Sequence, residues 1–207
     1  MHSYPNLGYN VRMSTNAIKP VRNRAYYAAQ NEMIKRQAVA NFRYLAECAT
    51  PDILAAAEAW YADAGSFAQS LPRHDWSFAT ACSVVSAFSP RVTWAQNKRK
   101  AMDYAHGITP KGLKAHVAAA DRCVVDGFDG LRGLKTNAFA RAIAGDGNAV
   151  VVDVWMCRAA NLGKDAPTSK GKYNAIADAV REVAQEFNMS PAIMQAMIWI
   201  VIRGKAQ

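Results

Sequence analysis

The sequence predicts an all-α protein, and three observations support this fold class. Signals for a helix start recur along the chain, because Thr50-Pro51, Thr109-Pro110 and Ser190-Pro191 each place a capping hydroxyl directly before a proline. Apolar residues between positions 172 and 188 recur every three or four residues, as on one face of a helix. Only residues 149–153, AVVVD, have the composition of a strand, and no partner strand is apparent elsewhere. About eight to ten helices are therefore expected.

The predicted elements follow one another in a simple order. Residues 1–24 lack helical or strand periodicity and are expected to form an irregular arm, whereas residues 25–207 are expected to form a single helical domain. Within that domain each of the three start signals opens a helix, and Ser89-Pro90 ends an apolar segment. Residues 149–153 are expected to be a buried extended stretch that leads into a helix.

The chain is strongly basic. Its 25 Lys and Arg residues against 16 Asp and Glu residues give a formal net charge of +9. An excess of this size favours a polyanionic partner such as nucleic acid over an acidic small molecule. A basic protein without such a partner is the alternative.

The cysteines and the N-terminal residues limit the class of protein further. The four cysteines, at positions 48, 82, 123 and 157, form no Cys-x-x-Cys pair, so neither a metal site nor another cofactor is predicted. They are expected to be small core residues in a reducing compartment. No secretory signal and no apolar run of roughly 18 residues is present, so we expect an intracellular monomer with no membrane partner.

A lysine, an apolar run and an acid stand at a characteristic interval in the middle of the chain. Lys135 precedes Asp153 by eighteen positions, and the acid directly follows the apolar run 149–152. The order of residues resembles the helix-hairpin-helix DNA glycosylase superfamily, most closely its endonuclease III branch, and the size resembles small phage-encoded members. The matching residues are Gly130, Gly133, Lys135-Thr136, Val152-Asp153, Arg158 and Asn161. More weakly, Ser86-Ala87-Phe88 and Asn97-Lys98 stand where the branch has Ser-Ala-Gln and Asn-Lys.

The resemblance implies a two-lobed helical fold with a substrate cleft between the lobes. Such an enzyme would act on a damaged or modified base flipped out of duplex DNA, in the cytoplasm of a bacterium or of a phage-infected host. Asp153 would stabilise the positive charge that develops at C1′ as the glycosidic bond breaks, and the apolar run would hold its carboxylate rigidly. Lys135 would attack C1′ as a neutral amine and form a Schiff base, as in family members that also cleave the strand.

The resemblance also implies binding residues. A hairpin of this kind holds a DNA phosphate with backbone N–H groups and does not read sequence. The residues expected to contact DNA are Gly130, Arg132, Gly133, Thr136, Asn97 and Lys98. The residues expected to line the substrate pocket are Phe88, Trp155 and Arg158.

The sequence also departs from the family pattern. The hairpin lacks the usual proline. The same stretch can also be aligned with the family in another register, in which it forms no hairpin and Lys135 is a surface residue. Asp153 could serve only as the N-cap of a helix. Phe88 replaces the Gln of the branch and Trp155 replaces its His, and each could be a core residue instead. The four-cysteine iron–sulfur loop of the branch is absent.

Two other functions compete with base excision. Some phage members are thought to act in thymine hypermodification, as the alpha-glutamyl/putrescinyl thymine pyrophosphorylases do, rebuilding the base and leaving its glycosidic bond intact. A non-catalytic DNA-binding module that retains only the hairpin is the second alternative.

Overall fold

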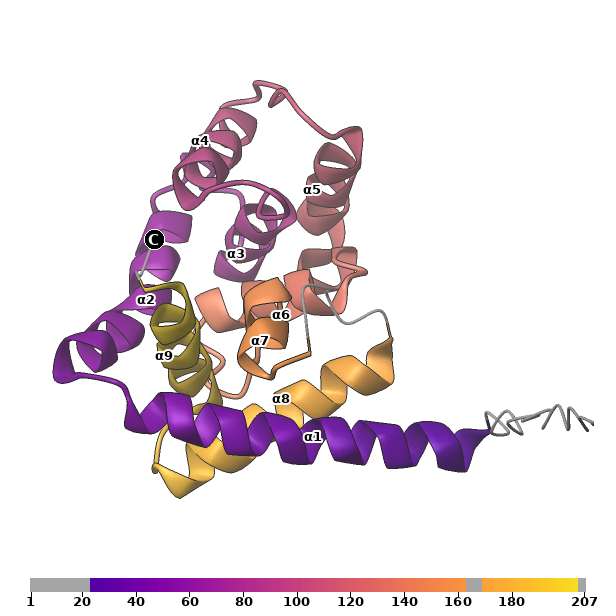
Figure 1. Cartoon of the computed structure of the whole chain (residues 1–207). Coiled ribbons are helices and arrows are strands. Elements are labelled where there is room, and N and C mark those ends of the chain that lie inside the picture. The colour runs from indigo at the N-terminus through magenta and orange to yellow at the C-terminus, as the bar shows by residue number, and fades with distance from the viewer. Residues whose placement is uncertain (1–22, 163–168, 205–207) are drawn as a thin grey trace, which may run out of the picture.

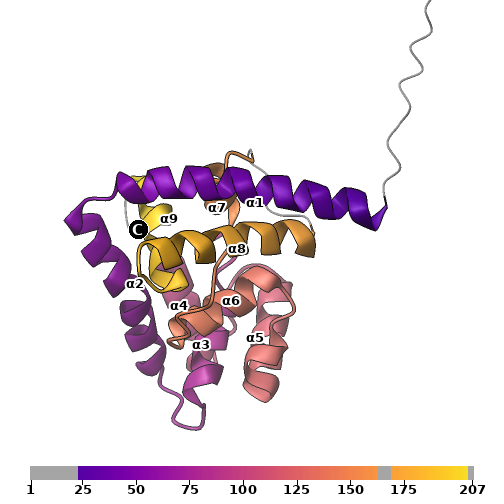
Figure 2. The same cartoon turned by 90° about the horizontal axis from the view of Figure 1, so that it is seen from below.

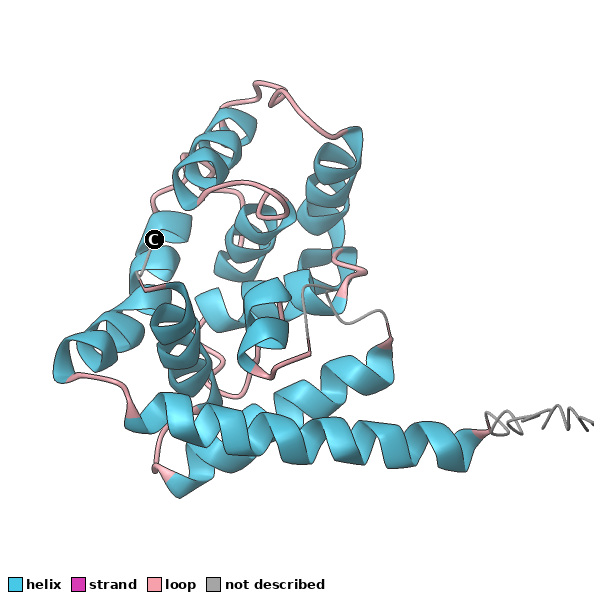
Figure 3. Ribbon diagram, viewed as in Figure 1, coloured by secondary structure: helices cyan, strands magenta, loops and turns pink. Residues whose placement is uncertain are grey.

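The computed structural model describes residues 23–162 and 169–204, so nearly all of the predicted arm, residues 1–24, lies outside the described ranges. Within these ranges the chain is all-α, as predicted, and consists of helices and loops (Figure 3). The elements are α1 (Arg24–Glu47), α2 (Pro51–Gln69), α3 (Phe78–Ala87), α4 (Trp94–Ala105), α5 (Lys114–Asp126), the short 3-10 helix η1 (Gly127–Gly130), α6 (Leu134–Ile143), α7 (Val154–Ala159), α8 (Lys170–Glu186) and α9 (Pro191–Arg203).

Two of the three predicted helix starts are confirmed. The Thr50 hydroxyl accepts the N–H of Ile53 at the start of α2, and the Ser190 hydroxyl accepts the N–H of Ile193 at the start of α9. The predicted start at Thr109-Pro110 is wrong, because α5 begins only at Lys114. Gly112 lies between, and its φ of 139° is incompatible with a helix.

Two hydrophobic cores hold the helices together. The first lies among α1, α7, α8, α9 and the first half of α2. The second lies among α3, α4, α5, α6 and the last part of α2. Figure 1 shows α1 and α8 on one side of the molecule and α3, α4 and α5 on the other, and Figure 2 shows α1 alongside α8. Since α2 contributes to both cores, it joins the two halves.

The apolar run before Asp153 passes between these cores. It is buried and extended without strand pairing, as predicted. Its side chains alternate, because Val150 and Val152 pack in the first core whereas Ala149 and Val151 pack in the second. An extended segment buried on both faces requires consecutive apolar residues, which explains why this run is apolar throughout.

The prediction that all four cysteines are core residues is wrong for one of them. Cys82, Cys123 and Cys157 are buried, but Cys48 caps the C-terminus of α1 and is exposed. Burial raises the pKa of the Cys82 thiol to about 12 and that of the Cys123 thiol to about 11, so both stay protonated at neutral pH.

Candidate functional site

A cavity of about 450 Å³ is bounded by residues of both cores. This volume lies in the range of small-molecule sites, about 300–1,000 Å³. The wall is built from α2, α4, α6, α9, the loop before α4 and the stretch that leads into α7. The cavity therefore lies where segments far apart in the sequence meet.

Lys135 and Asp153 both line this cavity. Lys135 is half-buried in the first turn of α6, and Asp153 is the half-buried N-cap of α7. They form no ion pair within 4.0 Å of each other. Lys135 and Asp153, eighteen positions apart in the sequence, thus line the same cavity.

Tyr173 of α8 joins the two segments that carry these residues. Its hydroxyl lies 2.8 Å from the carbonyl oxygen of Val150 and 3.3 Å from that of Leu134, and it accepts the N–H of Val152 at 3.3 Å. Burial raises the pKa of the Tyr173 hydroxyl, which keeps it a hydrogen-bond donor at neutral pH. This contact positions the start of α6 relative to the extended stretch before Asp153.

The carboxylate of Asp153 is held by three N–H groups. Its Oδ1 accepts the backbone N–H groups of Trp155 and Met156 at 2.8 and 3.0 Å, and its Oδ2 accepts the indole N–H of Trp199 at 3.1 Å. These donors are neutral, so they occupy the hydrogen-bonding positions of the carboxylate without neutralising its charge. The arrangement presents a fixed negative charge to the cavity.

Tryptophan dominates the cavity wall. Four of the five tryptophans in the chain line it, namely Trp60, Trp94, Trp155 and Trp199. The rings of Trp60 and Trp199 stack with centroids 5.7 Å apart, and Trp94 lies 5.6 Å from Trp60. Flat indole faces of this kind suit a planar aromatic ligand.

Positive charge outweighs negative charge on this wall. Arg91, Lys135 and Arg203 line the cavity together with one carboxylate, that of Asp153. The guanidinium of Arg203 lies 4.2 Å from the ring centroid of Trp199 and 5.6 Å from that of Trp155. Arg91 has a φ of 61°, an uncommon backbone conformation for a residue other than glycine. The cavity is therefore suited to a ligand that is both aromatic and anionic.

Polar groups complete the wall. The Tyr61 hydroxyl donates to Oε1 of Gln195 at 2.5 Å. Burial, and next the nearby Asp153 carboxylate, raise the pKa of Tyr61 strongly, so the phenol stays neutral. Within the described part of the chain, buried Oδ1 of Asn97 and Oγ of Ser89 have no hydrogen-bond partner.

The segment α5–η1–α6 occupies the place of the predicted hairpin. Gly130 is buried so tightly that a Cβ would lie 2.6 Å from backbone atoms of α5, whereas Arg132 and Gly133 are exposed. Gly133 precedes α6 without a side-chain cap, and Thr136 donates to its carbonyl oxygen at 3.0 Å. The carbonyl oxygen of Thr136 in turn accepts a hydrogen bond from Ser86 at 2.7 Å. Lys135 therefore follows a turn that is packed against α5 and α3.

Three predicted site residues lie in surroundings that differ from those expected. Phe88 does not line the cavity, because it is 1% exposed in the second core and packs against Tyr104. Asn97 is 2% exposed and lines the cavity, so it is not a surface contact for phosphate. Lys98 lies over the rings of Trp94 and Phe67.

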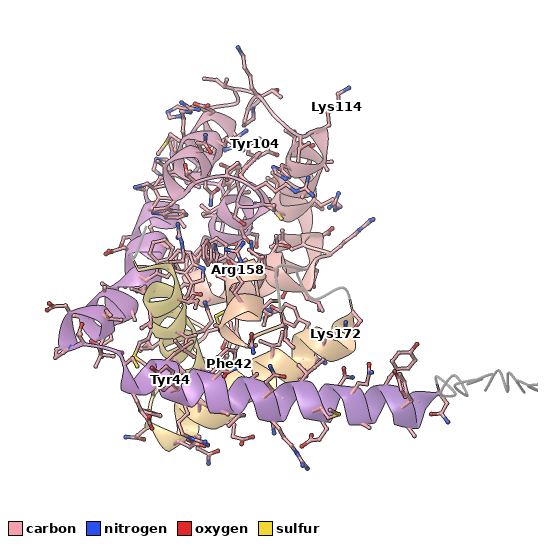
Figure 4. The ribbon with its side chains drawn as sticks, in the orientation of Figure 1. Phe42, Tyr44, Tyr104, Lys114, Arg158 and Lys172 are labelled. Carbon is pink, nitrogen blue, oxygen red and sulfur yellow. The ribbon has the colours of Figure 1, made fainter. Side chains whose placement is uncertain are left out.

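The remaining predicted pocket residues lie at the cavity. Trp155 lines it, and Arg158 is exposed with its guanidinium 4.3 Å from the Trp155 ring centroid. Figure 4 shows Arg158 on α7. Arg158 therefore contacts the wall without forming it.

Sequence reasoning missed most of the wall. The residues not predicted include Trp60, Tyr61, Trp94, Gln195, Trp199 and Arg203. Aromatic residues at helical spacing are usually core residues, so only the unusual number of tryptophans hinted at a shared role. Within the described ranges, no group of three His, Cys, Asp or Glu residues is placed to hold a metal ion.

The structure thus defines an α-helical protein with an aromatic and cationic cavity between two cores. Residues 24–206 match the model of a family of unknown function, DUF7178, and the chain belongs to that family. No curated protein and no solved structure matches the chain. No helix within the described ranges has the length and apolar character needed to cross a membrane.

Proposed function

We propose that this protein is a DNA glycosylase with a helix-hairpin-helix fold that acts on a base flipped into the tryptophan-lined cavity. The observation that carries the proposal is the placement of Lys135 and Asp153 on one cavity, eighteen positions apart in the sequence. Their position on one cavity beside four tryptophans supports a role beyond that of a surface lysine and a helix cap. The base would be a damaged or modified one.

The proposed chemistry uses the two residues in different ways. The neutral amine of Lys135 attacks C1′ of the flipped nucleotide, the C1′–N bond breaks, and the base leaves with the bonding electron pair and takes up a proton. Ring opening then gives an imine between Lys135 and the sugar, from which the 3′ phosphate can be eliminated. Positive charge grows on the sugar before the bond to the nucleophile is complete. The fixed carboxylate of Asp153 stabilises that charge.

Two further features support the fold assignment. The segment α5–η1–α6 has the order helix, tight turn, helix, and the uncapped start of α6 presents backbone N–H groups suited to a phosphate. The two cores with a cavity between them correspond to two lobes flanking a cleft. In this assignment the net charge of +9 supplies attraction to the DNA backbone.

One observation favours a second candidate function. Arg91 and Arg203 line the cavity but take no part in the steps above. A base that carries an anionic substituent would use them, as in phage-type hypermodification on a glycosylase-like fold. In that case the base is rebuilt and its glycosidic bond stays intact.

Mass spectrometry of the products distinguishes these functions. The protein is incubated with duplex DNA from several sources, including DNA with modified pyrimidines, and free bases and nucleosides are then quantified. Release of a free base, absent with Asp153→Asn, is the expected result. A changed nucleoside without free base would favour hypermodification. Neither product on any DNA would leave only a binding module and contradict the proposal.

A further inference from the structure

Arginine and tryptophan side chains form a cluster on one side of the cavity. The guanidinium of Arg203 lies 4.2 Å from the ring centroid of Trp199 and 5.6 Å from that of Trp155. The guanidinium of Arg158 lies 4.3 Å from the same Trp155 centroid. Arg203 and both tryptophans line the cavity, whereas Arg158 is exposed beside it. Two positive charges therefore share one indole ring of the cavity wall.

Neither of these arginines has a carboxylate partner. Among the residues that the structure describes, no ion pair within 4.0 Å includes Arg158 or Arg203. Arg73, in contrast, lies 4.8 Å from the centroid of the Trp76 ring and also forms an ion pair with Asp75 at 2.7 Å. A guanidinium that stacks on an indole face keeps the N–H groups at its edge free to bind an anion. Two neighbouring guanidiniums repel each other, and an anion bound between them would offset that repulsion.

Trp199 sets the position of this cluster relative to Asp153. Its indole N–H donates to Oδ2 of Asp153 at 3.1 Å, and the guanidinium of Arg203 lies over its ring. The same ring stacks on that of Trp60, with centroids 5.7 Å apart. An anion bound by Arg203 would therefore be separated from the carboxylate by one indole, beside a tryptophan-lined space that suits an aromatic ring. A nucleotide combines both features, since one sugar links its phosphate to its base.

We propose that Arg203 and Arg158 form a binding site for the phosphate of a nucleotide whose base lies in the cavity. Trp155 and Trp199 hold the two guanidiniums in place, and the guanidiniums donate N–H groups to phosphate oxygens. The inference rests on the proposed function, since it takes the ligand of the cavity to be a nucleotide. It adds a phosphate site that no step of the proposed chemistry uses. The phosphate belongs either to the DNA backbone or to a free mononucleotide, and the test distinguishes the two.

The test compares nucleosides with nucleotides and needs no turnover. The common deoxynucleosides and their 5′- and 3′-monophosphates are titrated into the full-length protein, and tryptophan fluorescence is excited beyond the absorption of the bases. Four of the five tryptophans line the cavity and report on binding. At least one monophosphate is expected to bind on the order of tenfold more tightly than its nucleoside, because charge-assisted hydrogen bonds are added. Equal affinity in every pair, or no binding at all, overturns the inference.

Methyl esters of the same monophosphates identify the source of the phosphate. A methyl ester keeps one negative charge, as a phosphodiester of the DNA backbone does. An ester that binds as tightly as the monophosphate assigns the site to backbone phosphate, whereas an ester that binds no better than the nucleoside assigns it to a free mononucleotide. Because all these ligands carry unmodified bases, an anionic substituent on the base does not contribute to the difference.

Variants then assign the effect of the phosphate to the two arginines. Arg203→Gln is expected to lower the affinity ratio of nucleotide to nucleoside to about one, with nucleoside binding retained. Arg158→Gln should lower the same ratio severalfold, and it leaves both cores intact because Arg158 is exposed. Arg73→Gln is the matched control, because Arg73 also lies over a tryptophan but does not line the cavity. A ratio that is unchanged in both site variants, or equally reduced in Arg73→Gln, overturns the inference.

The outcomes also separate this inference from the proposed function. A phosphate effect that depends on both arginines, without release of base from DNA, supports the inference and contradicts the proposed glycosylase. Release of base by a protein that shows no phosphate effect has the opposite meaning.

Discussion

Asp153 uses its two carboxylate oxygens for different contacts. Oδ1 caps α7 through two backbone N–H groups, and Oδ2 accepts the indole N–H of Trp199. Capping and a catalytic role are therefore compatible, because the cap fixes the direction of the carboxylate while its charge remains. A substitution can remove the charge and keep the cap, since Asn is as good an N-cap as Asp.

Asp153→Asn is accordingly expected to slow base release on the order of a hundredfold or more while leaving the fold intact. The change removes the negative charge opposite the developing charge at C1′. Single-turnover release of free base measures the rate, and circular dichroism checks the helix content. Asp52→Asn is the matched control, because Asp52 lies in the first turn of α2 and does not line the cavity. Equal rates for the wild type and Asp153→Asn would remove the acid from the mechanism.

The sequence alone predicts some of the residues that line the cavity and misses others. Lys135, Asp153 and Trp155 could be placed in one site because they belong to one continuous stretch with a recognisable interval. Trp60 and Trp199 could not, because they come from α2 and α9, which are far apart in the sequence and meet only through tertiary packing. Phe88 misled the prediction, since an aromatic residue at the end of an apolar helix gives no sign of which core will bury it.

Among the elements, α8 sets the distance between α6 and the extended stretch before α7. The Tyr173 hydroxyl does this through contacts with main-chain atoms of Leu134, Val150 and Val152. Val150 and Val152 are buried, so their main-chain groups have no ready access to water, whereas Leu134 is exposed. The geometry of the site thus depends on a residue that does not line the cavity.

Tyr173→Phe is expected to lower the free energy of unfolding by about 1–3 kcal/mol, because buried main-chain groups lose a partner. Base release should slow as well, since the start of α6 is no longer tied to the stretch before Asp153. Chemical denaturation measures the stability. Tyr44→Phe is the control, because Tyr44 is 66% exposed on α1. A Tyr173→Phe protein as stable as Tyr44→Phe would show that the contact does not hold the two segments together.

The turn between α5 and α6 depends on a close approach at one glycine. A Cβ at Gly130 would lie 2.6 Å from backbone atoms of Arg122 and Cys123, whereas a Cβ at Gly133 would meet only the Thr136 side chain, at 3.0 Å. Gly130→Ala is therefore expected to cost about 1–3 kcal/mol and to weaken DNA binding. Gly133→Ala should change stability little. Thermal unfolding of both variants checks this difference, and similar Tm values would argue against a tightly packed turn.

The elements themselves were largely predictable, for identifiable reasons. Thr50-Pro51 and Ser190-Pro191 act locally, through one hydroxyl and one restricted φ, so they predict helix starts whatever the tertiary context. Thr109-Pro110 failed because the backbone of Gly112 interrupts the helix that it would open. Residues 149–153 showed their burial by composition, but the sharing of their side chains between two cores appears only in three dimensions.

For the whole molecule, the cavity lies between two cores, and the chain has a net charge of +9. If the proposed function holds, this charge attracts the DNA backbone. Binding to duplex DNA is expected to show little sequence preference and a steep salt dependence, because each phosphate that is neutralised releases counterions. With about four or five such contacts, affinity should fall on the order of a hundredfold between about 50 and 200 mM salt. Fluorescence anisotropy on duplexes of unrelated sequence measures this. Affinity that does not change with salt would argue against nucleic acid as the partner.

Borohydride trapping at Lys135 tests the central claim most directly. If Lys135 forms an imine with C1′, reduction should leave a covalent adduct between the protein and a DNA duplex that contains a susceptible base or an abasic site. Lys135→Gln should abolish both the adduct and strand cleavage, with DNA affinity almost unchanged. Lys114→Gln should retain them, because Lys114 also lies in the first turn of a helix but projects outward from the end of α5 (Figure 4). A Lys135→Gln protein that still forms the adduct and cleaves the strand at the wild-type rate would contradict the account.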